Sequence, residues 1–584
     1  MSLQPSSKFN LINASPVTNQ EIETHPVYKK LQGNILKGHG RDFSTNIFLE
    51  FRISDNGSKS VSKVKLRSAI ATLAEKYVTS AFTQYLESKQ YNQFRIPGSL
   101  FGNFFVSATG YKKLGQDVKG FKDKDTVPIG AENFFVKADS FINGMKATAE
   151  DLGDLPKGLD SIDPETIDFR LSPLQKKHLE EKGRIKEKVN LEPLEEAYQA
   201  GTIDGMLLLA DDDENGLLKE TRKVITELEQ KGILRVVAVE RGTALRNNEG
   251  EGIEHFGYVD GRSQPLYLVS DFAHLTLKNG AIDVSLTKER VNDKAAKREG
   301  ADINIWNPFA KLNLVLKKDP AIADADAFGS YFVFRKLEQD VLRFSIAEQQ
   351  LADALKLQGQ DRERAGAMIV GRFRDGTPLI LSEADGFVPA KENNFRYDDQ
   401  QAIGGVNPLG KDTLGLKCPF QAHIRKTNPR ESTDSASEEG DLRRRITRRG
   451  ITYGNRNKHP NAFQTLDELP TGDVGLLFAC FQSSIVSQYA FMQRTWADNT
   501  SFKQPGAGID PLIGQPFDME EASRPQQSWR KQYGAALVEV LPAAVDLEST
   551  HKTKKRIDNF IQFRGGEFFF APSIPFLLNN GDKS

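Results

Sequence analysis

One segment, residues 204–245, constrains the fold of this chain more than any other. It begins and ends with the apolar runs DGMLLLADDD and ILRVVAVERGTAL, which have the length and composition of buried strands. Between them, NGLLKETRKVITELEQKG repeats apolar residues at helical spacing, and Gly232 stands where such a helix would end. The segment therefore predicts a strand, a helix and a second strand, and we expect this unit to close a first domain near residue 250.

The same alternation of strands and helices continues on both sides of this unit. Before it, residues 46–53 alternate like a strand and residues 61–88 have helical spacing. After it, the predicted elements are strands at 329–344 and 473–482 and helices at 346–359, 362–371 and 485–498. No regular repeat period occurs, so a solenoid is not expected.

The chain has 584 residues, which is too long for a single hydrophobic core. We predict an irregular N-terminal arm over 1–28, a first domain over 29–250 and a second over 251–584. Residues 270–320 look like an insertion. The acidic stretch ESTDSASEEGD, residues 431–441, is predicted to be a mobile surface loop.

Composition excludes several classes of protein. The formal net charge is −1, which offers no general surface for nucleic acid. The two cysteines, Cys418 and Cys480, exclude a disulfide framework and a cysteine-rich metal site. The first residues do not resemble a signal peptide, and no apolar run is long enough to cross a membrane. We therefore expect a cytoplasmic protein, with secretion left open and the oligomeric state undetermined.

The stretch HFGYVDGRSQP, residues 255–265, places Asp260 between Gly257 and Gly261. An ordinary loop explains this pattern, because glycine tolerates positive φ and Asp-Gly is a common turn pair. A cap on the next turn explains it equally well. Taken alone, the motif leaves these readings open beside a functional one.

Among the eight histidines, His423 has a distinctive setting in KCPFQAHIRKTNPR. An apolar approach precedes it, and Arg425, Lys426 and Arg430 follow. This pattern suits an axial ligand of haem, whose propionates need basic partners, although a histidine in a basic loop would also explain it. A second basic stretch, LRRRITRRGITYG, follows at 442–454. The HExxH, GxSxG and GxGxxG motifs are absent, and GVNPLGKDT places Asp412 where a phosphate loop needs a hydroxyl.

Taken in order, GYVDG, CPFQAHIRKTNPR, RRGITYG and GLLFACFQ closely resemble the dye-decolorizing peroxidase family. LQGNILKGHGR, GSYFVFRKLEQ and AGAMIVGRFRDGTPL strengthen the resemblance, which covers roughly residues 30–520. Length and the KTNPR stretch are most similar to the larger class with fungal and cyanobacterial members. The resemblance implies an α+β fold of two ferredoxin-like domains, of the dimeric α/β-barrel type. It also implies one haem b per chain in the C-terminal domain.

The resemblance assigns roles to particular residues. Asp260 matches the distal aspartate, Arg448 the distal arginine and His423 the proximal iron ligand. Because the acidic insert lengthens the spacing between His423 and Arg448, Arg449 remains an alternative distal arginine.

Four further positions carry over. Leu476 and Phe478 match apolar residues over the distal face of the haem, and Arg430 matches a propionate-binding position. Asp510, more loosely aligned, matches the carboxylate behind the proximal histidine.

The implied function is a haem peroxidase. It would use H₂O₂ to oxidise dyes, phenols and similar reductants in one-electron steps through a compound I intermediate. The alternative is a haem-handling or iron-releasing protein on the same fold, and a third reading is a haem-free interaction protein. Of the three tryptophans, Trp496 is expected to carry oxidation of bulky dyes to the surface, although core packing would also explain it; Trp306 and Trp529 are weaker candidates.

Overall fold

The structure is a computed structural model of the whole chain. The described residues are 16–52, 59–123, 139–149, 152, 154, 194–199, 202–271, 310–386, 395–398, 412–430, 435–514, 527, 529–534, 540–541 and 560–578. Most of the expected insertion at 270–320, including Trp306, lies outside them. Residues 16–28, predicted as part of an irregular arm, contain the short helix α1 (Asn19–Thr24), which Thr18 and Glu21 cap reciprocally, and the start of α2 (Val27–Lys30).

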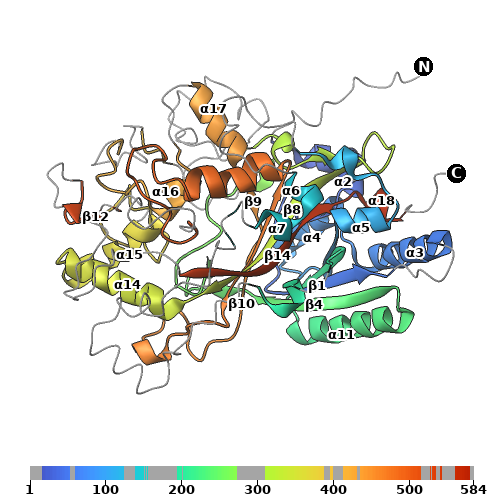
Figure 1. Cartoon of the computed structure of the whole chain (residues 1–584), viewed down its shortest axis with the longest axis horizontal. Helices are drawn as coiled ribbons and strands as arrows, with labels where there is room; N and C mark the ends of the chain where they lie inside the picture. The colour runs from blue at the N-terminus through green and yellow to red at the C-terminus, as the bar shows by residue number, and fades with distance from the viewer. Residues whose placement is uncertain are drawn as a thin grey trace.

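One antiparallel sheet forms the centre of the molecule (Figure 1). Its strands are β1 (Phe43–Phe51), β2 (Phe101–Ser107), β3 (Gly205–Asp211), β4 (Leu234–Thr243), β7 (Lys317–Lys318), β8 (Phe328–Gln339), β9 (Thr447–Arg448), β10 (Ile451–Tyr453), β11 (Gly475–Gln482) and β14 (Ile561–Ala571). The order is β10–β11–β8–β14–β2–β3–β1–β4, with β7 paired to β8 and β9 paired to β11.

The sheet consists of two halves with the same strand order. In the first half, β4 pairs with β1, β1 with β3 and β3 with β2; in the second, β14, β8, β11 and β10 follow the same sequence. In each half the fourth strand along the chain therefore lies beside the first, which is the ferredoxin-like arrangement. The predicted α+β fold with two ferredoxin-like units is confirmed. The exact domain boundary near residue 250 stays a prediction.

The two halves are joined edge to edge, and they share their cores. Phe569 and Phe570 of β14 lie opposite Ser107 and Val106 of β2. Successive side chains of a strand point to opposite faces, so Phe569 packs into one apolar cluster and Phe570 into another. Both clusters contain residues of both halves, because the β14–β2 pairing continues each face across the junction.

Helices cover both faces of the first half. Residues 61–88, predicted as one helical stretch, form α3 (Lys59–Tyr77) and α4 (Ala81–Phe94). The helix breaks because the backbone of Thr79 bonds to Gly33 and Gly102, while the Ser80 hydroxyl accepts the Thr83 N–H and starts α4. The predicted helix between β3 and β4 is α11 (Glu214–Lys231), and Gly232 ends it with φ of 64°.

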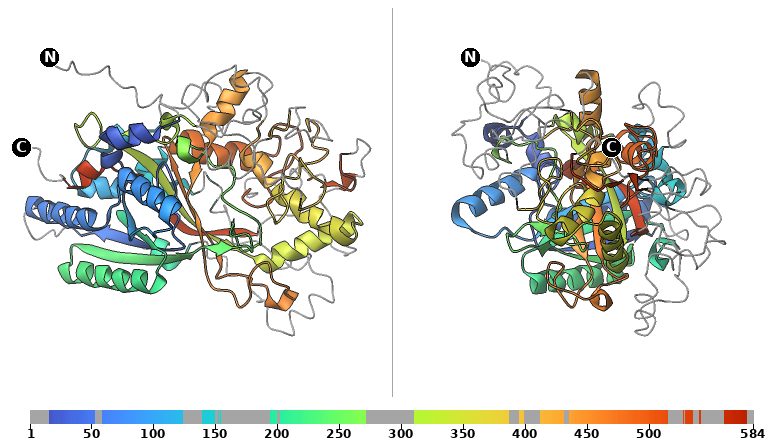
Figure 2. Two further views of the ribbon diagram at one scale, coloured as in Figure 1. Left: turned by 180° about the vertical axis from the view of Figure 1, so that it is seen from behind. Right: turned by 90° about the vertical axis from the view of Figure 1, so that its left-hand side faces the viewer.

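The second half carries α14 (Val341–Ala354), α15 (Glu363–Val370), α16 (His423–Thr427), α17 (Ser435–Arg444) and the π-helical segments η9 (Ile485–Ala490) and η10 (Met492–Ala497). In Figures 1 and 2, α14 and α15 lie at one end of the molecule, and α3 and α11 at the other. Residues 435–441, predicted as a mobile loop, are helical in α17. The strand predicted to reach residue 344 ends at 339, because the Asp340 side chain caps α14.

The remaining described elements are short. They are α5 (Ala108–Lys113), α6 (Ser140–Asn143), α7 (Met145–Thr148), α10 (Glu196–Gln199), α18 (Ile574–Leu578), η2 (Val118–Phe121), η6 (Leu312–Leu314), η7 (Gly359–Arg362), η8 (Leu466–Glu468), β5 (Leu245–Arg246), β6 (Gly252–Ile253), β12 (Trp529–Arg530) and β13 (Val540–Leu541). None of the described helices has the length and apolar character that crossing a membrane requires.

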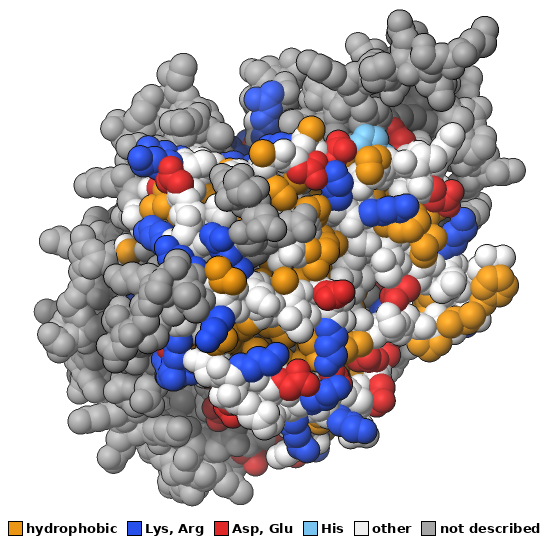
Figure 3. All heavy atoms as spheres, turned by 90° about the vertical axis from the view of Figure 1, so that its right-hand side faces the viewer, with side chains coloured by type: hydrophobic (Ala, Val, Ile, Leu, Met, Phe, Trp, Pro, Cys, Tyr) orange, Lys and Arg blue, Asp and Glu red, His pale blue; other side chains and the backbone are white. Residues whose placement is uncertain are grey.

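On the face shown in Figure 3, basic and acidic side chains are interspersed, in keeping with the small net charge.

A buried ion pair crosses between the halves and gives a stability prediction. The Arg335 guanidinium of β8 donates to both carboxylate oxygens of Asp154, at 2.8 Å for Oδ2, and both side chains are almost fully buried. Asp154→Asn should lower the free energy of unfolding by about 3–5 kcal/mol, because Arg335 keeps a buried charge without its counter-ion.

Urea denaturation of the purified protein measures this loss. The matched control is Asp353→Asn, which breaks the exposed pair with Arg362 and should cost at most about 1 kcal/mol. Equal losses in the two variants would contradict a special contribution from the buried pair.

Candidate active site

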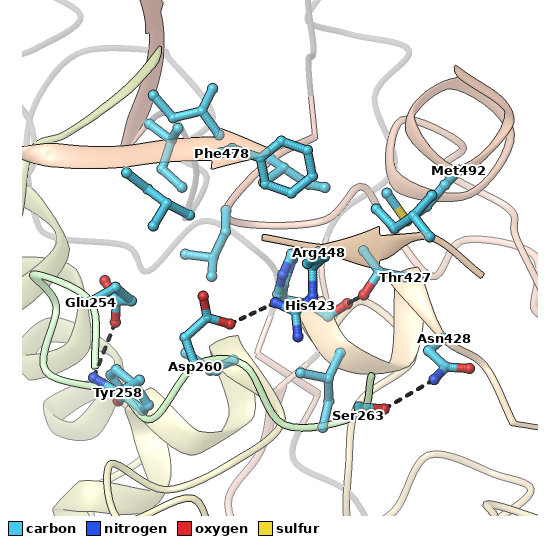
Figure 4. A pocket seen from close by; sticks show the side chains of 18 of the residues that line it. Glu254, Tyr258, Asp260, Ser263, His423, Thr427, Asn428, Arg448, Phe478 and Met492 are labelled. Carbon is cyan, nitrogen blue, oxygen red and sulfur yellow. Dashed lines mark hydrogen bonds and ion pairs between the residues drawn. The ribbon is translucent and has the colours of Figure 1, made fainter. Parts of the chain in front are cut away.

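A cavity that is partly open to solvent lies in the second half of the chain (Figure 4). Its walls include residues of the GYVDG loop, α16, β8, β9, β11, β14 and η10. The structure brings to it all the sequence-predicted site residues except Asp510: Asp260, His423, Arg430, Arg448, Leu476 and Phe478. Leu476 and Phe478 alternate with buried neighbours on β11, so both point to the cavity side of the strand.

The backbone of the GYVDG loop places Asp260 in the cavity wall. Gly257 has φ of 91° and Gly261 has φ of 82°, conformations that side-chain-bearing residues rarely adopt. The Asp260 N–H donates to the Gly252 carbonyl at 2.9 Å, which fixes the loop against β6. A Cβ on Gly261 would meet nothing within 4 Å, so conformation and not space explains this glycine.

Asp260 forms an ion pair with Arg448 at the cavity surface. The Arg448 guanidinium donates to Asp260 Oδ1 at 2.6 Å and to the Arg262 carbonyl at 2.8 Å. Burial acts to raise the pKa of the Asp260 carboxyl, but the charge and hydrogen bond of Arg448 and the Gly261 N–H together hold this pKa below its ordinary value. Asp260 is therefore an ionised carboxylate that can accept a proton.

The two candidate arginines are consecutive residues, Arg448 at the end of β9 and Arg449 directly after it, and their side chains point in different directions. Arg448 lies opposite Cys480 of β11 and turns its side chain into the cavity. The Arg449 side chain leaves on the other side and donates to the carbonyls of Asn34 at 2.7 Å and Ile35 at 3.3 Å. The acidic insert does not move Arg449 into the cavity, so Arg448 is the better candidate for the distal arginine.

His423 begins α16 on another wall of the same cavity. Its Nδ1 lies 2.8 Å from Oδ2 of Asp510, a fully buried carboxylate. The backbone N–H groups of Leu512 and Ile513 donate to the other oxygen of Asp510 at 2.8 and 3.1 Å. Since Nδ1 is engaged by Asp510, the ring presents Nε2 to the cavity for a metal or a ligand.

A buried lysine connects α16 to the segment that carries Asp510. Lys426 Nζ donates to the carbonyls of Trp496, at 3.1 Å, and Asn499. The Asp510 N–H donates in turn to the Ala497 carbonyl at 2.9 Å. The end of η10 thus holds Asp510 against His423, and burial lowers the pKa of Lys426 to about 8.

Basic side chains line one end of the cavity. Burial, followed by repulsion from Arg372, lowers the pKa of Arg430 well below its ordinary value. Burial also lowers the pKa values of Arg372 and Arg445 to about 10. An anionic group placed here would offset the cost of burying these cations. A histidine with Nε2 toward the cavity, apolar walls and these arginines fit a haem with two carboxylates.

Comparison with known proteins shows the family of the chain. The chain is 35% identical to the multifunctional dye peroxidase DyP2 of Amycolatopsis sp., over 95% of this chain and 96% of the relative. The chain belongs to the dye-decolorizing peroxidase family. No family model matches it.

Solved structures give the same answer as the sequence comparison. A DyP-type peroxidase of Anabaena sp. superposes with a TM-score of 0.72 at 32% identity, covering 98% of this chain and 99% of that one. The structure of DyP2 from Amycolatopsis sp. superposes with a TM-score of 0.71 at 34% identity, covering 97% and 99%. Members of this family are haem peroxidases that use hydrogen peroxide.

Sequence patterns did not indicate every residue of this peroxidase cavity. Glu254, Ser263 and Met492 also line it. Glu254 accepts the N–H groups of Phe256 and Tyr258 and so braces the GYVDG loop, and burial raises its pKa to about 7. The one sequence feature that could have indicated Glu254 is its position six residues before Asp260.

Two residues singled out by the sequence lie away from the cavity surface. His255, directly before the motif, is buried, and its Nε2 lies 2.8 Å from the Tyr453 carbonyl. Burial lowers the pKa of His255 to about 4. Trp496 is 4% exposed and packs against Phe491 and Phe502. A bulky dye cannot touch Trp496 directly, contrary to a surface role for that ring.

Proposed function

We propose that the cavity holds one non-covalent haem b with His423 as the iron ligand, and that the enzyme uses H₂O₂ to oxidise dyes, phenols and similar aromatic compounds. The observation that carries the proposal is a histidine backed by a buried carboxylate in the same cavity as an arginine–carboxylate pair. The relative named a multifunctional dye peroxidase supports dyes as one substrate class.

The binding of haem b follows from the chemistry of the cavity residues. Arg430, with neighbouring Arg372 and Arg445, would face the propionates, and Leu476 and Phe478 would cover the distal face. The chain has no Cys-x-x-Cys-His sequence for covalent attachment, and its two cysteines are buried away from the cavity lining.

When bound, haem would supply the iron for peroxide reduction and for one-electron oxidation of the reductant. The ionised Asp260 accepts a proton from one peroxide oxygen and returns it to the other, so that water can leave. Arg448 stabilises the negative charge that develops on the departing oxygen. Asp510 holds the Nδ1–H of His423, which orients the ring and makes Nε2 more basic.

Two measurements on haem-loaded protein test the proposal. The ferric protein should show a Soret band that changes on addition of one equivalent of H₂O₂, and it should turn over an anthraquinone dye in the steady state. A haem-handling or iron-releasing protein would instead liberate iron or porphyrin without turning over the dye. A haem-free protein would show no Soret band after purification with haem supplied.

The rate of reaction with H₂O₂ should depend on pH through Asp260. The carboxylate accepts a proton only when ionised, and its pKa lies below the ordinary value of about 3.9. The rate should therefore stay high at neutral pH and fall as the pH drops below about 4. Stopped-flow rates across this range measure the profile. If Glu254 accepted the proton instead, the fall would centre near its pKa of about 7.

Trp496→Phe tests electron transfer through the protein. Leu476 and Phe478 would cover the distal face of the bound haem and keep an anthraquinone from the iron, so electrons from bulky dyes should travel through aromatic side chains. Because phenylalanine is much harder to oxidise than tryptophan, dye turnover should fall while the reaction with H₂O₂ and turnover of a small phenol persist. Unchanged dye kinetics would exclude Trp496 and direct attention to Tyr453 or Tyr533.

A further inference from the structure

Met492 is the first residue of η10 and lines the peroxidase cavity. Figure 4 shows its side chain, with the sulfur in yellow, projecting from its helical segment toward the other labelled side chains of the site. Only 6% of the residue is exposed. Since Met492 lines the cavity, a small molecule that enters the cavity can reach this side chain.

The other described methionines are placed differently. Met145, Met206 and Met368 are at most 1% exposed, and none of them lines the cavity. They pack among apolar side chains of the three cores, and Met492, which packs in the same core as Met145, differs from them in also lining the cavity. The chain therefore contains three methionines that can serve as internal controls for one that faces the site.

We propose that Met492 is an oxidation site at which the enzyme's own co-substrate limits its working life. The inference rests on the proposed function, which brings H₂O₂ into this cavity. The thioether sulfur attacks one peroxide oxygen, an S–O bond forms and the O–O bond breaks. The departing hydroxide takes up the remaining proton and leaves as water, so the sulfur is oxidised by two electrons and the peroxide is reduced.

The cavity surroundings favour this reaction at Met492. Arg448, which the proposed function places beside H₂O₂, lines the same cavity as Met492, and a positive charge stabilises a departing hydroxide. A protein thioether needs no deprotonation before it reacts, so access to peroxide decides which methionine is oxidised. Access separates Met492 from Met145, Met206 and Met368.

The position of Met492 explains why its oxidation would matter. The sulfoxide oxygen is a hydrogen-bond acceptor, yet Met492 packs in an apolar cluster with Ile446 and Phe478. Relief of that mismatch would displace η10. The end of η10 holds Asp510 through the Ala497 carbonyl, so the displacement loosens the carboxylate behind His423. Activity then declines as the sulfoxide accumulates.

Peptide mass spectrometry on haem-loaded protein tests the inference. The protein is treated with a series of H₂O₂ concentrations, and each sample is divided for dye turnover and proteolytic digestion. The Met492 peptide should gain the mass of one oxygen before the Met145, Met206 and Met368 peptides do, and its gain should follow the loss of turnover. In Met492→Leu, initial turnover is measured first, and the loss relative to it should be slower.

The outcomes separate this inference from the proposed function. Lost turnover with an unmodified Met492 peptide, or simultaneous oxidation of all four methionines, overturns the inference. The same holds if Met492→Leu loses its turnover as fast as the parent protein. Selective oxidation of Met492 in a protein that never turned over dye would support the oxidation site and refute the proposed substrates.

Discussion

Replacing Arg448 by leucine should slow the reaction of the haem-loaded protein with H₂O₂ by a factor of about 10²–10³, the usual cost of removing one charge-stabilising donor. The guanidinium donates to Asp260 at 2.6 Å and faces the cavity, so leucine removes both the cation and the partner that keeps the carboxylate ionised. Stopped-flow absorbance at the Soret band measures the rate. Haem content should stay close to that of the parent protein.

Arg449→Leu is the matched control, because it removes an identical side chain one residue away. Arg449 bonds to the carbonyls of Asn34 and Ile35 and not to Asp260. Its loss should leave the rate with H₂O₂ within a few-fold of the parent. A slow Arg449→Leu and a normal Arg448→Leu would show that the distal arginine is Arg449. Asp260→Asn should also be slow, although less so if water relays the proton.

His423→Ala should abolish stable haem binding or the five-coordinate ferric spectrum, and dye turnover with it. His423 presents Nε2 to the cavity while Asp510 holds Nδ1, and no other histidine of the described chain lines the cavity. The absorbance ratio of Soret band to protein and the iron content measure the loss. Circular dichroism establishes that the fold survives.

His459→Ala controls for the removal of an imidazole. His459 is exposed, and its Nε2 lies 2.8 Å from the Arg246 carbonyl, away from the cavity lining. That variant should keep its haem and its turnover. Full haem content and normal turnover in His423→Ala would refute the ligand assignment.

Local patterns predicted the strands and the site motifs well. The runs that became β3, β8 and β11 are apolar because both faces of the sheet are covered, and such runs are visible without knowledge of their partners. Residues within one short motif, such as Asp260 and its glycines, were found for the same reason. That the separate motifs line one cavity could not be read from any of them, because it depends on the pairing of segments that are distant in the sequence.

Features that depend on contacts between distant residues were the ones missed or only loosely assigned. The break between α3 and α4 depends on Thr79 reaching Gly33 and Gly102, which helical spacing cannot reveal. Asp510 lies 87 residues beyond His423 in the chain, so only the folded geometry places its carboxylate behind the ring. Trp496 reads as a surface candidate in the sequence, yet its neighbours Phe491 and Phe502 enclose it.

The place of β14 in the sheet determines the order in which the two halves of the fold can form during synthesis. β14 lies between β8 and β2, and Ile561 and Phe563 from this strand line the cavity. All four strands of the first half have been synthesised when residue 243 is made, so that half can fold before β8 to β14 are complete. The cavity wall is incomplete until residues beyond 560 emerge. A cofactor can therefore be fully enclosed only after β14 has paired with β8 and β2.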